Sequence, residues 1–480
     1  MLKKLAGQTA TYGLSSIIAR LIGNLLLPLQ TGKLSLHDFS VLSEALSYAA
    51  LLSVLFPLGL ETALFRFSNE IPEQKTETEN RIISFQMLTA ILLCPLSFFF
   101  LHWRMPSLSS SDILVLTSTL VLDSILGIFL ASLRNSQKSL QFLKVRIVSI
   151  ALNIALNLFF LSGWESASAI NPLGINYQLI LWINFACSLL SFLPLTKLIY
   201  GYQWNLNSAL NKKVLAFSIP IVGIGLVGVS NDVLGRIWLE ALCPPGFYPG
   251  ISNENLIGIY SGAAKIAVFI NLGIQAYRYA ADPFFFSFKD RKDTAFYMAS
   301  SFTWFVAAGL LTLVAIKANL GLILSIFLRK PEFALGMDAI FILLLANFLF
   351  GVYYNLSFWY KFSGRTWWGT IISISGLLIN ALMNYLLVPK LGMTGAALSL
   401  LICYSFMCVS SWFLGRTAFP VAWAYGKTGI LFFTALFLCW IPEMVPVSGI
   451  YSLLAGIAIP LVYGGIIFLV QKDQFRRHAV

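Results

Sequence analysis

Residues 112–134 read DILVLTSTLVLDSILGIFLASLR, and between its charged ends the run carries only one charged group, Asp123. A helix rises about 1.5 Å per residue, so about 20 apolar residues cross the hydrocarbon layer of a membrane, which is about 30 Å thick. The run therefore predicts a membrane-spanning helix. Similar runs recur from end to end, because 58% of the residues are hydrophobic and only 11% are charged, against about a quarter in soluble domains. The mean hydropathy of +0.80 agrees.

Fourteen such segments, each placed to within about three residues, follow one another along the 480-residue chain: 8–30, 39–66, 82–102, 112–134, 141–162, 176–200, 214–239, 256–280, 294–316, 337–360, 366–388, 392–415, 424–441 and 447–470. A shorter apolar stretch, 321–327, is expected at the membrane interface or as an extension of the ninth helix. The predicted fold is therefore an all-α polytopic membrane protein of about 14 transmembrane helices. The short intervals between these segments leave no room for a soluble catalytic domain.

Lysine and arginine are distributed unequally between the two sides of this arrangement. With a cytoplasmic N-terminus, 23 of the 32 basic residues lie on inside faces and three lie within spans. Cytoplasmic loops of membrane proteins carry such an excess of Lys and Arg. We therefore expect both termini to be cytoplasmic in a bacterial inner membrane, and the net charge of +12 to reflect the membrane and not a nucleic-acid partner. Six basic residues remain in outside loops: Lys33, Arg104, Lys317, Arg329, Lys330 and Lys390.

An internal repeat is visible in two pairs of asparagines. Asn153 and Asn157 lie four residues apart in the fifth predicted span, and Asn380 and Asn384 repeat the pattern 227 residues later, in the eleventh. Asparagine commonly joins helices in membranes by hydrogen bonding. We therefore expect these pairs to pack helix against helix, with contact to a substrate as the less favoured alternative.

A second pair of similar motifs supports the repeat. Leu58-Gly-Leu in the second predicted span matches Leu272-Gly-Ile in the eighth, 214 residues later. An even-numbered repeat keeps its orientation, so its halves are related by an axis along the membrane normal, as in alternating-access carriers. The expected organisation is an N-lobe at 1–205, a C-lobe at 206–420, and two added helices with a cytoplasmic tail at 421–480.

Residues of the types used in catalysis are not grouped in the sequence. The histidines are isolated, the six cysteines include no Cys-x-x-Cys pair, and no phosphate-binding glycine loop is present. We therefore expect no enzymatic activity, no metal site and no cofactor.

Charged groups within apolar spans point to function, because each costs several kcal/mol unless it faces a partner or a wet cavity. Arg20 lies deep in the first predicted span with Asn24 one turn further on, and Lys265 lies in the middle of the eighth. Asp232 and Arg236 are four residues apart in the seventh, where a structural ion pair is the simpler alternative. Interfacial pairing or snorkelling is the corresponding alternative for Arg20.

Further candidates lie near the ends of corresponding spans. Arg66 and Arg278 end the second and eighth spans on the inside face, as anchors or as substrate-binding residues. Glu61 and Gln275 follow the equivalent Leu-Gly turns and could support nearby arginines. Asp123 is the strongest candidate acid for coupling an ion or balancing a cationic cavity.

The cations in these positions outnumber the acids. Such a balance favours an anionic substrate, and arginine grips phosphate oxygens in a bidentate way. A diphosphate-linked lipid fits this chemistry, whereas a cationic drug does not.

Wzx-type oligosaccharide flippases carry runs similar to three stretches of this chain: Tyr12-Gly-Leu-Ser-Ser-Ile, Leu58-Gly-Leu-Glu-Thr-Ala-Leu-Phe-Arg-Phe67, and Tyr260-Ser…Lys265-Ile…Gln275-Ala-Tyr-Arg-Tyr-Ala-Ala-Asp-Pro-Phe-Phe-Phe286. These flippases belong to the multidrug/oligosaccharidyl-lipid/polysaccharide (MOP) exporter superfamily. The sequences of these runs are similar to those of members from Bacteroidetes-type Gram-negative bacteria. The resemblance extends over the whole chain through helix number, repeat and helix order.

The resemblance implies two six-helix lobes arranged as a V around a cavity that opens alternately to either side. It implies an undecaprenyl-diphosphate-linked glycan as substrate, and Na⁺ or H⁺ as a possible coupling ion. In the related lipid II flippases, arginines of the first, second and eighth helices meet the diphosphate. Arg20, Arg66 and Arg278 match those helices by order, and Lys265 would be an additional cation.

We therefore expect a monomeric lipid-linked oligosaccharide flippase for surface polysaccharide or lipopolysaccharide (O-antigen) biosynthesis. Its partners would be membrane lipids and the glycan polymerase and glycosyltransferases of the same pathway. One alternative is a multidrug or small-molecule ion-coupled exporter of the same fold, which needs an acidic cavity. Another is a membrane-embedded glycan polymerase or ligase, although these usually carry a sizeable periplasmic loop. A scramblase without ion coupling is a third.

Overall fold

The computed structural model describes residues 25–70, 72–161, 174–206, 208–287, 294–444 and 450–478, and in these ranges all regular structure is helical. Twelve helical segments within them are long and apolar enough to cross a membrane. One of the twelve covers two predicted spans, and the predicted span 8–30 lies almost wholly outside the described residues. The prediction of an all-α, multi-pass membrane protein is confirmed, with fourteen as an approximate helix count.

The chain divides into two compact units, Met1–Ser261 and Gly262–Val480. The predicted lobes rest on the sequence repeat and stay a prediction. In the first unit α11 packs against α3 and α4, and α6 packs against α5 and α9. Apart from two short 3-10 turns, its described helices are α2 (Leu27–Lys33), α3 (Leu36–Leu55), α4 (Leu60–Phe67), α5 (Lys75–Arg104), α6 (Ser110–Asn135), α7 (Ser139–Leu161), α9 (Tyr177–Leu190), α10 (Thr196–Tyr200), α11 (Ser208–Leu242) and the start of α12 (Asn253–Ser287).

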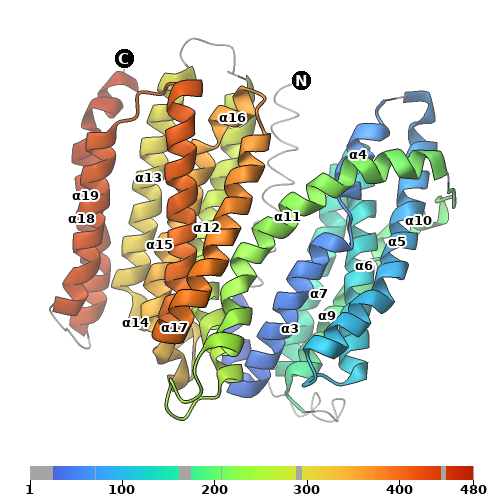
Figure 1. Ribbon diagram of the computed structural model, residues 1–480, viewed down its shortest axis with the longest axis horizontal. Helices are drawn as coiled ribbons and strands as arrows, with labels where there is room; N and C mark the ends of the chain where they lie inside the picture. Colours follow the sequence, from blue (N-terminus) through green and yellow to red (C-terminus); the bar gives the residue numbers. More distant parts are fainter. Residues whose placement is uncertain are drawn as a thin grey trace. The chain divides into compact units, whose positions relative to one another are not determined.

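The second unit holds the rest of α12 and a bundle in which α15 packs against α17. The last two helices, α18 and α19, lie side by side against α13 (Figure 1). A short helix, α14, follows α13 at Asn319, so the apolar stretch 321–327 forms a separate helical turn and not a continuation of α13. The described helices are α13 (Thr294–Ala318), α14 (Leu320–Phe327), α15 (Met337–Leu356), α16 (Phe358–Phe362), α17 (Trp367–Ala418), α18 (Tyr425–Met444) and α19 (Ile450–His478).

The second predicted span is broken into α3 and α4. Pro57, Leu58 and Gly59 interrupt the helix, and both Leu58 (φ 47°) and Gly59 (φ 67°) have left-handed backbone conformations. A Cβ atom at Gly59 would come within 3.2 Å of the Ser218 carbonyl oxygen on α11. Glycine therefore allows both the turn and the close approach to α11, and the break sets the direction of α4, which carries Glu61 and Arg66.

A similar break divides α17 at Gly392, whose φ of 55° and ψ of −130° are not helical. A Cβ atom at Gly395 would meet the Leu387 carbonyl oxygen, so the chain turns sharply between the two halves. The two predicted spans 366–388 and 392–415 correspond to these halves. The first half carries Asn380 and Asn384.

Candidate functional site

Arg66 lies at the end of α4 in the first unit. Its guanidinium carbon lies 4.5 Å from the centre of the Phe217 ring on α11, and its Nε lies 3.6 Å from Glu70 Oε1. Both charged side chains are more than half exposed. The arginine therefore has an aromatic surface on one side and a carboxylate one turn away.

Arg278, in the second unit, also lies over an aromatic ring, as Arg66 does in the first. Its guanidinium carbon lies 4.5 Å from the centre of the Tyr354 ring on α15. Lys361 of α16 places its Nζ 4.2 Å from the centre of the same ring and 4.7 Å from that of Phe358. Two cations thus share one tyrosine. Among the side chains that the structure describes, no carboxylate lies within 4.0 Å of the Arg278 guanidinium.

Tyr277 holds the neighbouring turn of α12 in place. Its hydroxyl donates a hydrogen bond to Asn355 Oδ1 at 2.6 Å and lies 2.9 Å from Ser301 Oγ. Because Asn355 follows Tyr354 in the chain, these contacts fix α12 against α15 at the level of Arg278. The cationic pair of Arg278 and Lys361 around Tyr354 is called the Tyr354 site below.

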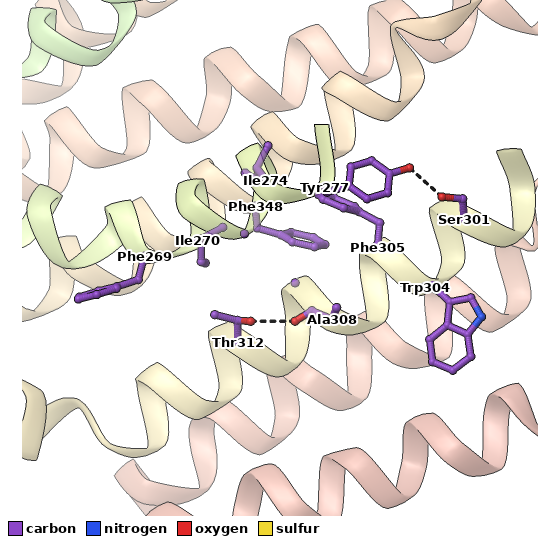
Figure 2. A pocket seen from close by; sticks show the side chains of 12 residues that line it. Phe269, Ile270, Ile274, Tyr277, Ser301, Trp304, Phe305, Ala308, Thr312 and Phe348 are labelled. Atoms are coloured by element: carbon purple, nitrogen blue, oxygen red, sulfur yellow. Dashed lines mark hydrogen bonds between the residues drawn. The ribbon is translucent and has the colours of Figure 1, made fainter. Parts of the chain in front are cut away.

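An apolar cavity of about 270 Å³ lies next to Tyr277, between α12, α13 and α15. Figure 2 shows Tyr277 and Ser301 at one end of it, with Phe305 and Phe348 between the helices. None of its lining residues is charged. The cavity therefore suits an apolar group and not the phosphates of a substrate.

Glu61 points to a different arginine from the one nearest in sequence. Its Oε2 accepts a hydrogen bond from Arg134 Nη2 of α6 at 2.8 Å. A Cβ atom at Gly127 would lie 2.9 Å from Glu61 Oε1, so glycine leaves room for this carboxylate between α4 and α6. The pair balances a charge within the first unit and leaves Arg66 to Glu70 and Phe217.

Asp123 lies in a polar group formed by α6, α7 and α9. Its Oδ1 accepts a hydrogen bond from Ser188 Oγ at 2.6 Å, and Arg146 of α7 acts on it electrostatically. Asn153 on α7 reaches the neighbouring turn of α9, with its Nδ2 at 3.4 Å from Asn184 Oδ1. The acid that was predicted to couple an ion is therefore held by a neighbouring helix.

The two asparagine pairs have the same internal geometry. Asn157 Nδ2 donates to the Asn153 carbonyl oxygen at 2.8 Å, and Asn384 Nδ2 donates to the Asn380 carbonyl oxygen at 2.9 Å. Asn157, Asn380 and Asn384 are fully buried. These three side chains therefore lie in the interior of their units, and their predicted role in helix packing stays a prediction.

Other predicted residues are placed individually. Arg236 Nη1 donates to Ser47 Oγ on α3 at 3.4 Å, and Asp232, one turn earlier on α11, acts on it electrostatically. Lys265 and Gln275 are half-buried on α12. Arg20 and Asn24 lie outside the described residues.

Three charged residues near these sites were not predicted from the sequence to be site residues. Lys361 lies at the inside end of its predicted span, where lysine is common, and only the fold brings it to Tyr354. Arg134 was counted as an inside loop residue. Glu44 could have been identified as a candidate from the sequence, because it is a carboxylate within the predicted span 39–66.

The overall architecture defines a class of membrane transporter folds. Over 96% of this chain and 99% of the other, it is similar to the lipid II flippase MurJ in an inward closed conformation, with a TM-score of 0.73 and 16% sequence identity. It is also similar to an inward-facing multidrug resistance MATE family transporter of the MOP superfamily, with a TM-score of 0.64 and 13% identity over 84% of this chain and 97% of the other. A MOP superfamily transporter from Pyrococcus furiosus matches with a TM-score of 0.58 and 12% identity over 86% and 95%.

At the level of sequence, the family model described as "Polysaccharide biosynthesis protein" matches residues 5–289, which is more than half of the chain. The chain belongs to this family, and it has the fold that MurJ and MATE transporters share. No curated protein matches it significantly in sequence.

Proposed function

We propose that the protein is a flippase that moves an undecaprenyl-diphosphate-linked oligosaccharide across the bacterial inner membrane by alternating access, for surface polysaccharide such as O-antigen. Membership of the polysaccharide biosynthesis family and the flippase fold support this proposal. The observation that carries it is the Tyr354 site, where Arg278 and Lys361 face one ring. The protein is proposed to act as a transporter without enzymatic activity, with both termini in the cytoplasm.

Stacking on an aromatic ring suits a phosphate-binding arginine. The ring attracts the guanidinium through its face and leaves the N–H groups at the edge free to donate. Those donors match the oxygens of a diphosphate in a bidentate way. Lys361 adds a second positive charge, so the site suits a group with more than one negative charge.

The lipid part of such a substrate needs an apolar surface. A second cavity, of about 300 Å³, lies between α13, α15, α17 and α18 and is lined mainly by aromatic and aliphatic residues, including Phe348, Trp412 and Phe432. We propose that the isoprenoid chain lies along the last two helices at this cavity. The glycan itself is proposed to occupy a water-filled space, with Arg20, Arg66, Arg236 and Lys265 as further cations toward the diphosphate.

Ion coupling is proposed to involve Na⁺ or H⁺. Asp123, with its bond from Ser188, and Asp232, beside Arg236, are the proposed ion-coupling or charge-balancing groups. Glu61 is proposed to balance charge through Arg134.

The test is a flipping assay with purified protein in proteoliposomes that contain a fluorescent short-chain prenyl-diphosphate oligosaccharide. Arg278→Ala should abolish flipping. Lys317→Ala is the control, because Lys317 Nζ also lies over an aromatic ring, that of Phe341, at 5.2 Å, but at the end of the second unit that is predicted to face outward. Unchanged flipping in Arg278→Ala would remove the Tyr354 site from the proposal.

The fold of MATE transporters favours a second candidate, an exporter of small molecules. The same proteoliposomes distinguish the two functions when they are loaded with a cationic dye. Export of the dye without movement of the prenyl diphosphate would favour the exporter.

A further inference from the structure

Charged residues from four helices gather at the end of the first unit that is predicted to face outward. Glu44 lies nine residues into α3, Arg104 ends α5, Glu240 lies near the end of α11, and Glu254 is in the first turn of α12. Arg104 Nη2 lies 3.7 Å from Glu240 Oε2. The charges of Glu240, Arg104 and Glu254 all act on the Glu44 carboxylate.

Glu44 is the most deeply buried of these acids, with 9% of its surface exposed. Within the described residues, its carboxylate accepts no hydrogen bond and forms no ion pair within 4.0 Å. Tyr48, one turn further along α3, is also buried, and the Arg104 guanidinium carbon lies 5.5 Å from the centre of its ring. Glu44 therefore lies in the middle of the group without a direct partner among the described side chains.

The charges in this group do not balance. Three carboxylates share Arg104, and Arg104 makes its close contact with Glu240. Arg236, one turn deeper on α11, interacts with Asp232, Ser47 and Tyr260. A buried carboxylate near other carboxylates is costly as an anion, because burial and like charge both favour the neutral form.

Among the remaining helices that pack against α3, α2 brings one cation, Lys33 in its last turn, but this side chain is exposed and forms no ion pair within 4.0 Å with a described carboxylate. On α6 and α9, Asp112 accepts a hydrogen bond from the Tyr177 hydroxyl at 3.1 Å, close to Asp38 at the start of α3. These groups add negative charge at that end of the unit.

A proton and a metal ion could each neutralise the excess negative charge. A metal ion needs several ligands around one point. In the described part of the chain, no three His, Cys, Asp or Glu side chains are close enough together to hold one. A proton needs a single carboxylate, so the spacing of these acids favours a proton.

We propose that Glu44 is a proton-binding site, and that the proton is exchanged with the outer face through Glu240 and Glu254. Nothing in this inference requires the glycan, because it concerns only the charge of the first unit. A coupling of this proton to transport rests on the proposed function and is measured separately below.

Infrared difference spectroscopy of the full-length protein in lipid nanodiscs tests the site directly. A protonated carboxyl group has its own C=O band, which disappears as the pH of the buffer rises through the titration of the group. We expect such a band in the unmodified protein and its loss in Glu44→Gln. Glu77→Gln is the control, because Glu77 is an exposed carboxylate paired with Arg81 on α5 and should leave the band intact. Because Asp123 is a second carboxyl group that can contribute a band of its own, the two proteins are compared by difference: if the spectrum of the unmodified protein minus that of Glu44→Gln contains no protonated C=O band, the proposal is overturned.

A second variant keeps the test decisive if Glu44→Gln fails to fold. Glu240→Gln removes one neighbouring negative charge, so the band of Glu44 should disappear at a lower pH than in the unmodified protein. An unchanged pH dependence in Glu240→Gln overturns the proposal.

The link to transport is tested in the proteoliposome assay with a pH gradient imposed across the membrane. Glu44→Gln should flip the prenyl diphosphate at a rate that no longer responds to the gradient. Loss of the infrared band together with an unchanged response would retain the proton site and refute its coupling to transport. No flipping by any protein, including the unmodified one, would count against the proposed function alone.

Discussion

The arginine of the first unit and the arginine of the second are matched in the sequence but differ in what surrounds them. Arg66 and Arg278 each lie 4.5 Å from the centre of an aromatic ring. Arg66 has Glu70 one turn away, whereas Arg278 shares its ring with Lys361. Both arginines have an acid four residues further along the chain, Glu70 and Asp282, and the described difference between the two motifs is the second cation, Lys361, at Tyr354.

This comparison indicates that the two motifs have the same cation–ring distance and differ in the number of described cations at the ring. The asparagine pairs of α7 and α17 also have matching hydrogen bonds, although the residues around them differ. If an anion is bound by both units, we expect the second unit to contribute more of the binding free energy, because two described cations lie at the Tyr354 ring and only Arg66, among the described cations, lies at the Phe217 ring.

The largest expected effect comes from removing the arginine of the second unit. Arg278→Ala should weaken binding of a short-chain prenyl diphosphate by about 10- to 100-fold, because hydrogen bonds to charged groups contribute about 1.5–3 kcal/mol. Arg66→Ala should weaken it less. Isothermal titration calorimetry in detergent measures both, and equal losses would break the proposed asymmetry between the units.

The asparagine pairs should differ in stability and not in binding. Asn384→Ala should lower the free energy of unfolding by about 1–2 kcal/mol, because it removes buried hydrogen bonds. Asn157→Ala should have a smaller effect, since Asn153 beside it is only half-buried and already contacts Asn184. Thermal unfolding in detergent compares the two variants. A larger loss for Asn157→Ala would contradict the prediction.

Replacing the second cation of the Tyr354 site should have an intermediate effect. Lys361→Met keeps much of the side-chain volume and removes the charge, so prenyl diphosphate affinity should fall by about fivefold, or about 1 kcal/mol. Lys361→Arg should retain binding. If both variants bind like the unmodified protein, Lys361 does not contribute to the site.

The smallest expected effect comes from removing the acid beside Arg66 in the first unit. Glu70→Gln removes the carboxylate near Arg66, and exposed ion pairs of this kind contribute about 0–1 kcal/mol. The affinity for prenyl diphosphate should therefore rise by no more than about fivefold. Its dependence on salt concentration should also increase. A fall in affinity would show that Glu70 orients Arg66 instead of offsetting its charge.

The positions of most spans were predictable, because hydropathy adds up residue by residue along a helix. The predicted spans 112–134 and 294–316 correspond to α6 and α13 with similar bounds, whereas α5 begins at Lys75, before the predicted span 82–102. The break between α3 and α4 was missed, although Pro57 and Gly59 mark it in the sequence, because the surrounding residues remain apolar. Of the predicted site residues, Arg66 and Arg278 lie at aromatic rings near the ends of their spans, whereas Lys361 was not predicted, because only the fold brings it to the ring that Arg278 contacts.

The sequence by itself determined that this is a multi-pass, all-helical membrane protein, because apolar content and its spacing are properties of the chain alone. Only the tertiary structure decided which charges meet. Glu61 pairs with Arg134, 73 residues away, and Arg104 approaches Glu240, far along the chain. Successive side chains on a helix point about 100° apart, so a charged residue's partner depends on how each helix is rotated against its neighbours. That rotation is set by packing across the whole unit, and for this reason the charged neighbours of Glu44 could be identified only in the folded chain.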